Sequence, residues 1–137
     1  MDAGRPAAPL ARKLGVRPGD SLLLAGAPAG FEVAGLPPDV LVRRAAGPAG
    51  PFDVALWYPV DRAELADRLA EFRAAMRPAA GLWVAWPKRA SRVPTDLTED
   101  VLREVALPTG LVDNKVCAVD ATYSGLRLVI RRELRGR

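Results

Sequence analysis

The sequence predicts a single α/β domain built on a mostly parallel sheet of about six strands that ends in an antiparallel hairpin. Three stretches of the 137-residue chain lead to this prediction. Residues 51–88 show the pattern of a strand, a capped helix and a strand, residues 21–25 form a short apolar run, and residues 114–131 show two β-like segments around a turn. Two strands joined through a helix are expected to be parallel neighbours in one sheet.

The strand, helix and strand within residues 51–88 form the most regular part of the chain. Residues 53–58 (DVALWY) and 82–86 (LWVAW) are the two predicted strands. Between them, Asp61 and Glu64 have the spacing of a capping box, and Glu64 and Arg68 have the spacing of an i,i+4 ion pair. Apolar side chains recur on one face of the predicted helix at Leu65, Leu69, Phe72 and Met76. This face is expected to lie in the core.

The N-terminal half predicts two further strands with little helix between them. Residues 10–14 place two leucines four apart and predict one short helical turn, and residues 21–25 (SLLLA) predict a strand covered on both faces. The glycines and prolines of residues 26–39 leave room for one or two helical turns at most before a second strand at residues 40–43. Residues 44–51 are too few for a crossover helix, but when extended they reach roughly 26 Å, enough to pass across one neighbouring strand.

The C-terminal part predicts a second helix followed by a hairpin. Thr95 or Asp96 is expected to cap the helix. Its inner face is expected to carry Val101, Leu102 and Val105. The hairpin consists of a strand at residues 114–119, a turn at residues 120–125 and a strand with alternating apolar positions at residues 126–131.

Composition places limits on the class of protein. Residues 1–9 are predicted to be a flexible segment, residues 10–132 the domain and residues 133–137 a basic tail. Neither a signal-peptide core nor a membrane-spanning run is recognisable, so the sequence predicts a soluble cytoplasmic protein. The chain has no histidine, which removes the commonest general base and metal ligand, and its one cysteine, Cys117, is expected to be a buried small apolar residue. We therefore predict neither a catalytic residue set nor a metal site.

The net charge of +4 comes mostly from arginine and has two interpretations. An Arg-, Ala- and Pro-rich chain follows from the base composition of the genome, or else the arginines form an anion-binding surface. Nucleic acid is a disfavoured third partner, because no basic cluster with interleaved aromatic residues stands out.

The order of elements, with a glycine turn, parallel βα units and a closing antiparallel hairpin, resembles the Rossmann-like class I methyltransferases that use S-adenosylmethionine. LGVRPGDSLLLAGAPAG is similar to the first strand and loop of that fold, and MRPAAGLWVAW is similar to one of its later strands. More narrowly, PFDV, WPK, TDLTEDVLRE and GLVDNKVCAVD followed by YSGLR are similar to a family of small bacterial proteins of unknown function. The resemblance implies a reduced methyltransferase-like fold over most of residues 10–132 and brings no activity with it.

The loop after the first strand departs from the methyltransferase pattern. That pattern expects an acidic residue two positions before the first glycine and then glycines at alternate positions, which here are Leu24, Gly26, Pro28 and Gly30. Leu24 has no carboxylate, and Pro28 has no backbone N–H and a fixed φ. The cofactor loop of the resembling family is therefore altered at two positions.

The end of the second strand departs from the pattern as well. The resembling fold places an acid there to hold ribose hydroxyls, whereas this chain has Arg43 and Arg44. An arginine in such a place selects a ribose 2′-phosphate in dinucleotide-binding folds, which keeps a phosphorylated nucleotide as an alternative. With the altered loop, however, the sequence predicts no bound cofactor.

Candidate binding residues follow from the rule that open α/β sheets bind ligands outside the carboxyl ends of their strands. This rule selects Gly26, Gly30 and Lys88 as binding candidates and brings Tyr58 and Arg89 to the same rim. A tight turn also accounts for the two glycines, and a solvated side chain accounts for Lys88. Structural roles are expected for other notable residues, namely a cap for Asp96, sheet packing for Trp57, Trp83 and Trp86, and turn formation for Asp120, Thr122, Tyr123 and Ser124.

The functional hypothesis is a non-catalytic accessory or regulatory domain that acts on a protein partner through its surface. The alternative is a protein that binds or acts on a small anionic ligand, such as a nucleotide or phosphorylated metabolite, at the carboxyl ends of the strands. Edge strands leave self-association into a homo-oligomer open. A pocket filled by Phe31, Tyr58 and their neighbours would favour the first hypothesis, and an open polar pocket the second.

Overall fold

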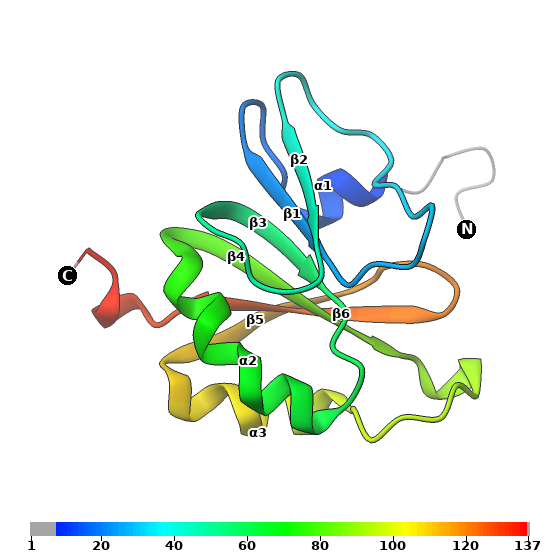
Figure 1. The fold of residues 1–137 in the computed structure, drawn as a ribbon. Coiled ribbons are helices and arrows are strands. Elements are labelled where there is room, and N and C mark those ends of the chain that lie inside the picture. The colour runs from blue at the N-terminus through cyan, green and yellow to red at the C-terminus, as the bar shows by residue number, and fades with distance from the viewer. Residues whose placement is uncertain (1–7, 137) are drawn as a thin grey trace.

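The computed structural model describes residues 8–136 and confirms the predicted α/β architecture, with a six-stranded sheet in the order β2-β1-β3-β4-β6-β5 (Figure 1). The strands are β1 (Ser21–Ala25), β2 (Leu41–Ala45), β3 (Phe52–Trp57), β4 (Met76–Pro87), β5 (Leu111–Ala118) and β6 (Tyr123–Ile130). The α-helices are α1 (Leu10–Leu14), α2 (Arg62–Ala75) and α3 (Glu99–Ala106). Short 3-10 turns follow β4 at Arg89–Ser91, α3 at Leu107–Thr109 and β6 at Arg132–Leu134. Residues 1–7 of the segment predicted to be flexible lie outside the described residues.

The topology follows the predicted crossovers. The strands β1, β2, β3 and β4 run parallel, and β3 pairs with β1 on the side opposite β2. The helix-free connection from β2 therefore passes across β1, as its length predicted. The last two strands form the predicted antiparallel hairpin, and β6 inserts between β4 and β5.

Two cores cover the two faces of this sheet. One core lies under α2 and α3, where the rings of Trp57 and Phe72 stack with centroids 4.2 Å apart. The other lies on the α1 side, where the buried indole of Trp83 donates from Nε1 to the Leu14 carbonyl oxygen at 3.0 Å. Trp86 is also buried, so the predicted packing role of the three tryptophans is confirmed.

Two predicted features of the first half differ in the structure. Residues 26–40 contain no helix, because successive turns with positive φ at Gly26, Gly30 and Gly35 carry the chain from β1 to β2. Gly35 also lies against Pro9, and a Cβ at this position would come within 2.5 Å of the Pro9 ring. The strand β4 begins at residue 76, six residues before its predicted start, because Met76 pairs with Phe52 ahead of a register shift.

The caps of the two longer helices are a mixture of confirmed and corrected predictions. Asp61 caps α2 by accepting from the Glu64 N–H at 2.9 Å, while Glu64 Oε1 accepts from the Val60 N–H at 2.8 Å. Arg68 forms its ion pair with Glu71 at 3.5 Å, not with Glu64. The cap of α3 is Thr98, whose Oγ1 accepts from the Val101 N–H at 3.1 Å.

Thr95 and Asp96, the predicted caps of α3, have other roles. Asp96 Oδ1 accepts from the Arg62 N–H at 2.9 Å and so links the loop before α3 to the start of α2. Thr95 Oγ1 accepts from the Leu97 N–H at 3.0 Å within its own turn. Cys117 is partly buried rather than fully buried, and burial raises the pKa of its thiol. No helix in the described part of the chain is long and apolar enough to cross a membrane.

Candidate functional site

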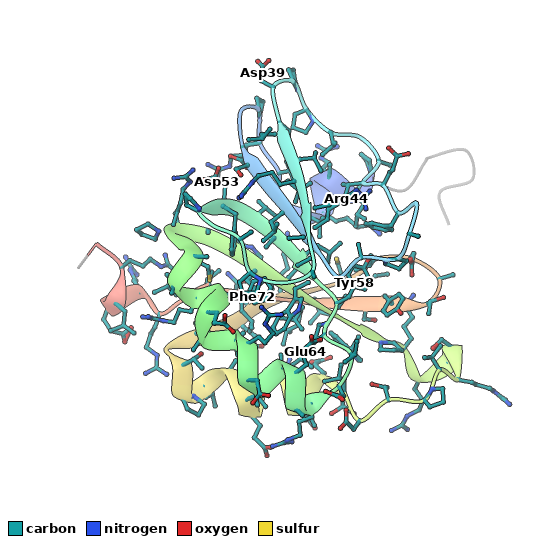
Figure 2. All side chains as sticks on the ribbon, in the orientation of Figure 1. Asp39, Arg44, Asp53, Tyr58, Glu64 and Phe72 are labelled. Atoms are coloured by element: carbon teal, nitrogen blue, oxygen red, sulfur yellow. The ribbon has the colours of Figure 1, made fainter. Side chains whose placement is uncertain are left out.

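The candidate site lies where β1, β3 and β4 end at one rim of the sheet. Figure 2 labels Tyr58 at this end of β3 and Asp53 at the opposite end. Two neighbouring cavities open at the rim, of about 420 Å³ and about 500 Å³. Gly26 and Tyr58 line the first, Lys88 lines the second, and both cavities share the segment Val93–Thr95. The structure thus brings two of the three predicted binding residues to the same rim and places them in separate hollows.

Gly26 serves the sheet more than the cavity. Its N–H donates to the Ala45 carbonyl oxygen at 2.9 Å, so this amide is already used between β1 and β2. Its φ is +66°, and a Cβ here would lie 3.2 Å from the carbonyl oxygen of Tyr58, so glycine permits a close approach of the β1 and β3 ends. Gly30 is exposed, does not line either cavity, and has no atom within 4 Å of a Cβ built on it.

An aromatic cluster fills the inner side of the rim. The rings of Phe31 and Tyr58 meet edge to face at 5.9 Å, and those of Tyr58 and Tyr123 do so at 5.0 Å. Only 7% of Tyr58 is exposed. Edge-to-face rings at these distances attract one another beyond their apolar burial. The rings of this cluster therefore pack beside the cavity of about 420 Å³ that Tyr58 and Tyr123 line.

The hydroxyl of Tyr58 is buried and has no hydrogen-bond partner among residues 8–136. Burial, with smaller effects from Asp120 and Tyr123, raises the pKa of this phenol far above its usual value. A phenol in this state stays protonated at neutral pH and cannot act as a general base. Asp120 instead stabilises the hairpin turn, where its Oδ1 accepts from the N–H groups of Thr122 and Tyr123 at 2.9 and 2.8 Å.

The second cavity carries the positive charge of the rim. Lys88, Arg89 and Arg92 line it together with Trp86 and Glu99. The backbone below Lys88 is held on both sides, since its N–H donates to the Thr122 carbonyl oxygen at 2.8 Å and its carbonyl oxygen accepts from the Ser91 hydroxyl at 2.6 Å. Within the described part of the chain, the three cations form no ion pair.

Arg43 and Arg44 do not contribute to this positive rim. Arg43 reaches toward the amino end of the sheet, where its Nη2 donates to the carbonyl oxygens of Pro51 at 2.6 Å and Ala49 at 3.1 Å. Arg44 donates to the Phe31 carbonyl oxygen and so ties the loop that carries Phe31 to β2. Both side chains stabilise loops, which the sequence pattern did not indicate.

Sequence reasoning also missed two residues of the rim. The sequence predicts that Tyr123 forms a turn, but it begins β6 and packs against Tyr58, which lies 65 positions earlier in the chain. Arg92 joins Lys88 and Arg89 because a turn with positive φ at Arg92 itself follows the Arg89–Ser91 segment. No sequence signal indicates the contact between Tyr123 and Tyr58. Arg92 could have been included, because it is a basic residue only three positions after Arg89. No group of three or more potential metal ligands occurs in residues 8–136.

The fold defined by this sheet is methyltransferase-like, as comparison with solved structures shows. A SAM-dependent methyltransferase from Aquifex aeolicus superposes with a TM-score of 0.64 at 15% identity, covering 87% of this chain and 86% of that one. A putative methyltransferase from Thermoplasma acidophilum gives a TM-score of 0.52 at 9% identity over 86% of this chain and 71% of the other. At these identities the likeness concerns the fold alone. No protein-family model and no curated protein matches the sequence.

The residues at the rim do not fit S-adenosylmethionine. Leu24, at the position where the resembling pattern has an acid, is 2% exposed within the α1-side core. The Gly26 amide is already bonded, and the aromatic cluster of Phe31, Tyr58 and Tyr123 occupies the inner side of the rim.

Proposed function

We propose that the protein is a non-catalytic domain of methyltransferase-like fold that serves as an accessory or regulatory module for a protein partner. The observation that carries the proposal is the aromatic cluster of Phe31, Tyr58 and Tyr123. Its rings pack aromatic surface along the inner side of the rim, where the Tyr58 hydroxyl is the buried side-chain polar atom that lacks a partner within residues 8–136. The cytoplasmic location and an assembly with itself, for which the edge strand β2 with its 60% exposed Leu41 is available, stay predictions.

Calorimetric titration with S-adenosylmethionine tests this proposal. The expected result is no saturable heat with ligand up to about 1 mM, where the binding free energy would be about 4 kcal/mol. S-adenosylhomocysteine, which lacks the sulfonium charge, separates a failure of charge recognition from a failure of space and is expected to give the same result. Saturable binding of either compound at low micromolar concentration contradicts the proposal.

A second candidate function is the binding of a small anionic ligand, such as a nucleotide or phosphorylated metabolite, beside Lys88. The supporting observation is the cavity of about 500 Å³ that carries Lys88, Arg89 and Arg92 without an ion-pair partner in residues 8–136. Cavities of this size hold small ligands, and unpaired cations supply the matching charge.

Thermal-shift measurements with millimolar nucleotides and phosphorylated metabolites test this second candidate. Stabilisation that Lys88→Ala abolishes is expected if the rim binds the anion. Lys115→Ala is the control, because Lys115 lies on the edge strand β5 and lines neither rim cavity. Stabilisation that persists in Lys88→Ala, or no stabilisation at all, counts against the candidate.

A further inference from the structure

A third hollow lies at the amino end of the parallel strands, at the end of β3 opposite the rim. It has a volume of about 350 Å³ and lies around Asp53, which Figure 2 labels. Three arginines from separate elements line it, namely Arg17 from the turn before β1, Arg77 from β4 and Arg127 from β6. The chain between Met76 and Gly81 forms its wall, because the β3–β4 register shift places residues 77–80 beyond regular pairing.

Arg127 is the unusual member of this arginine group. It is partly buried and lies over Gly81 of β4, where a Cβ would come within 2.6 Å of the Arg127 Nε. A guanidinium offers five N–H donors, yet in residues 8–136 its one hydrogen bond is from Nη1 to the Asn114 Oδ1 at 3.4 Å. Burial, and then the nearby charges of Arg135 and Arg17, lower the pKa of Arg127. A partly buried cation with one long hydrogen bond and no carboxylate partner is poorly compensated in the folded chain.

The acidic residues of the hollow are already engaged with other groups. Asp53 accepts from the Ser21 N–H at 2.9 Å through Oδ2 and pairs with the Arg77 Nε at 3.0 Å through Oδ1. Asp20 Oδ2 accepts from the backbone N–H of Arg17 at 2.8 Å. The guanidinium of Arg17 itself has no ion pair within the described chain. Two carboxylates facing three guanidiniums leave the hollow with a positive excess, and Arg127 receives no carboxylate.

We propose that this hollow binds a phosphoryl dianion, either inorganic phosphate or the phosphate of a small monoester, between Arg127 and Arg17. Guanidinium forks match phosphate oxygens with paired N–H donors, and such charge-assisted bonds are stronger than neutral ones. A bound dianion would supply the acceptors that Arg127 lacks and would offset the repulsion among Arg127, Arg17 and Arg135. A hollow of about 350 Å³ suits a small phosphorylated molecule, whereas a nucleic-acid strand follows an extended groove. The site lies at the other end of the strands from the rim, so it is independent of the proposed accessory role.

Calorimetric titration of the full chain with inorganic phosphate, and separately with glycerol 3-phosphate, tests this proposal. Saturable binding with a Kd of about 1 mM or tighter is expected, with chloride at matched ionic strength as the reference. Arg127→Gln and Arg17→Gln are each expected to weaken binding at least tenfold. Gly81→Ala keeps every charge but displaces the Arg127 guanidinium, and is expected to weaken binding similarly. Arg12→Gln is the matched control and is expected to leave the Kd unchanged, because Arg12 is an exposed residue of α1 that lines neither this hollow nor the rim cavities.

The alternatives give distinct results. The proposal is overturned if chloride at matched ionic strength gives the same saturable heat as phosphate. It is also overturned if neither Arg127→Gln nor Arg17→Gln changes the Kd for phosphate. Retention of a single-stranded RNA without binding of either small phosphate also overturns it, because the hollow would then be part of a nucleic-acid surface. If Arg127→Gln fails to fold, the exposed Arg17→Gln variant decides the outcome. Loss of binding in Arg92→Gln but not in Arg17→Gln assigns the phosphate to the rim and contradicts the proposal.

Discussion

Tyr58→Phe tests the packing of the rim with the removal of one oxygen atom. The hydroxyl of Tyr58 is buried and has no hydrogen-bond partner in residues 8–136, whereas its ring contacts Phe31 and Tyr123. Leaving a buried polar group unpaired costs about 1–3 kcal/mol, and phenylalanine keeps the ring contacts. The variant is therefore expected to match the wild-type free energy of unfolding at pH 7 or to exceed it by about 1 kcal/mol in urea denaturation.

The same pair of proteins is expected to diverge at alkaline pH. Because burial raises the pKa of Tyr58 above the value of about 10 that a tyrosine has in an unfolded chain, the folded protein keeps this proton while the unfolded chain releases it. The contribution of Tyr58 to stability is thus complete below pH of about 10 and is lost as the pH rises further. The free energy of unfolding is expected to fall more steeply above that pH in the wild type than in Tyr58→Phe.

Two results would refute this reasoning. A loss of more than about 1 kcal/mol in Tyr58→Phe at pH 7 would show that the hydroxyl forms a stabilising hydrogen bond. Identical pH dependence of the two proteins above pH of about 10 would show that the phenol is not desolvated. Tyr123→Phe, which alters the less buried tyrosine of the same cluster, is the control and is expected to change stability by less than about 0.5 kcal/mol.

Three further predictions concern the loops, α3 and the cysteine. Gly30→Ala is expected to lower the free energy of unfolding by roughly 1–2 kcal/mol because Gly30 has a positive φ. Gly26→Ala is expected to lower it by more, because Gly26 also has a positive φ and its Cβ would in addition meet the carbonyl oxygen of Tyr58. Equal losses in urea denaturation would contradict this close approach. Thr98→Ala is expected to lower the free energy of unfolding by about 1 kcal/mol in the same assay, and Thr95→Ala by less. A larger loss in Thr95→Ala than in Thr98→Ala would indicate that Thr95 caps α3. The Cys117 thiol, with its raised pKa, is expected to react with a disulfide reagent at pH 8 more slowly in the folded protein than in urea, and equal rates would argue against its burial.

Local patterns predicted those parts of the fold that depend on neighbouring residues in the chain. The apolar run of β1 was placed with its observed bounds, Ser21–Ala25, and Asp61 was recognised as the cap of α2 because its acceptor role is local. The hairpin of β5 and β6 followed from alternation of apolar positions and from turn residues. The short connection from β2 implied that β3 returns beside β1, because chain length limits reach.

Long-range contacts decided the features that the sequence left out. Thr95, Asp96 and Thr98 are all good capping residues within four positions; Thr98 caps α3, whereas Asp96 accepts from the Arg62 N–H at the start of α2. Tyr123 meets Tyr58 because β6 inserts beside β4, which no local pattern encodes. Arg127 likewise reaches the hollow at the amino end through that strand insertion.

The side chains of Arg43 and Arg44 show the same limitation at the level of single residues. Their positive charge near a strand end favoured an anion site, since charge alone does not indicate which acceptor a long side chain reaches. In the structure both donate to backbone carbonyl oxygens of loops, Arg43 to those of Ala49 and Pro51 and Arg44 to that of Phe31. Candidate cations in sequence-based site predictions therefore depend on the loops that fold around them.

The most direct test of the non-catalytic account is an amide-resolved NMR titration with S-adenosylmethionine, which reports on the loop itself. The Gly26 and Gly30 amides lie at the place where the resembling fold holds its cofactor, and Gly26 is already bonded to Ala45. The account predicts that neither amide resonance shifts with ligand up to about 1 mM. Shifts of both resonances that saturate at low micromolar ligand would contradict it and would restore the loop as a cofactor site.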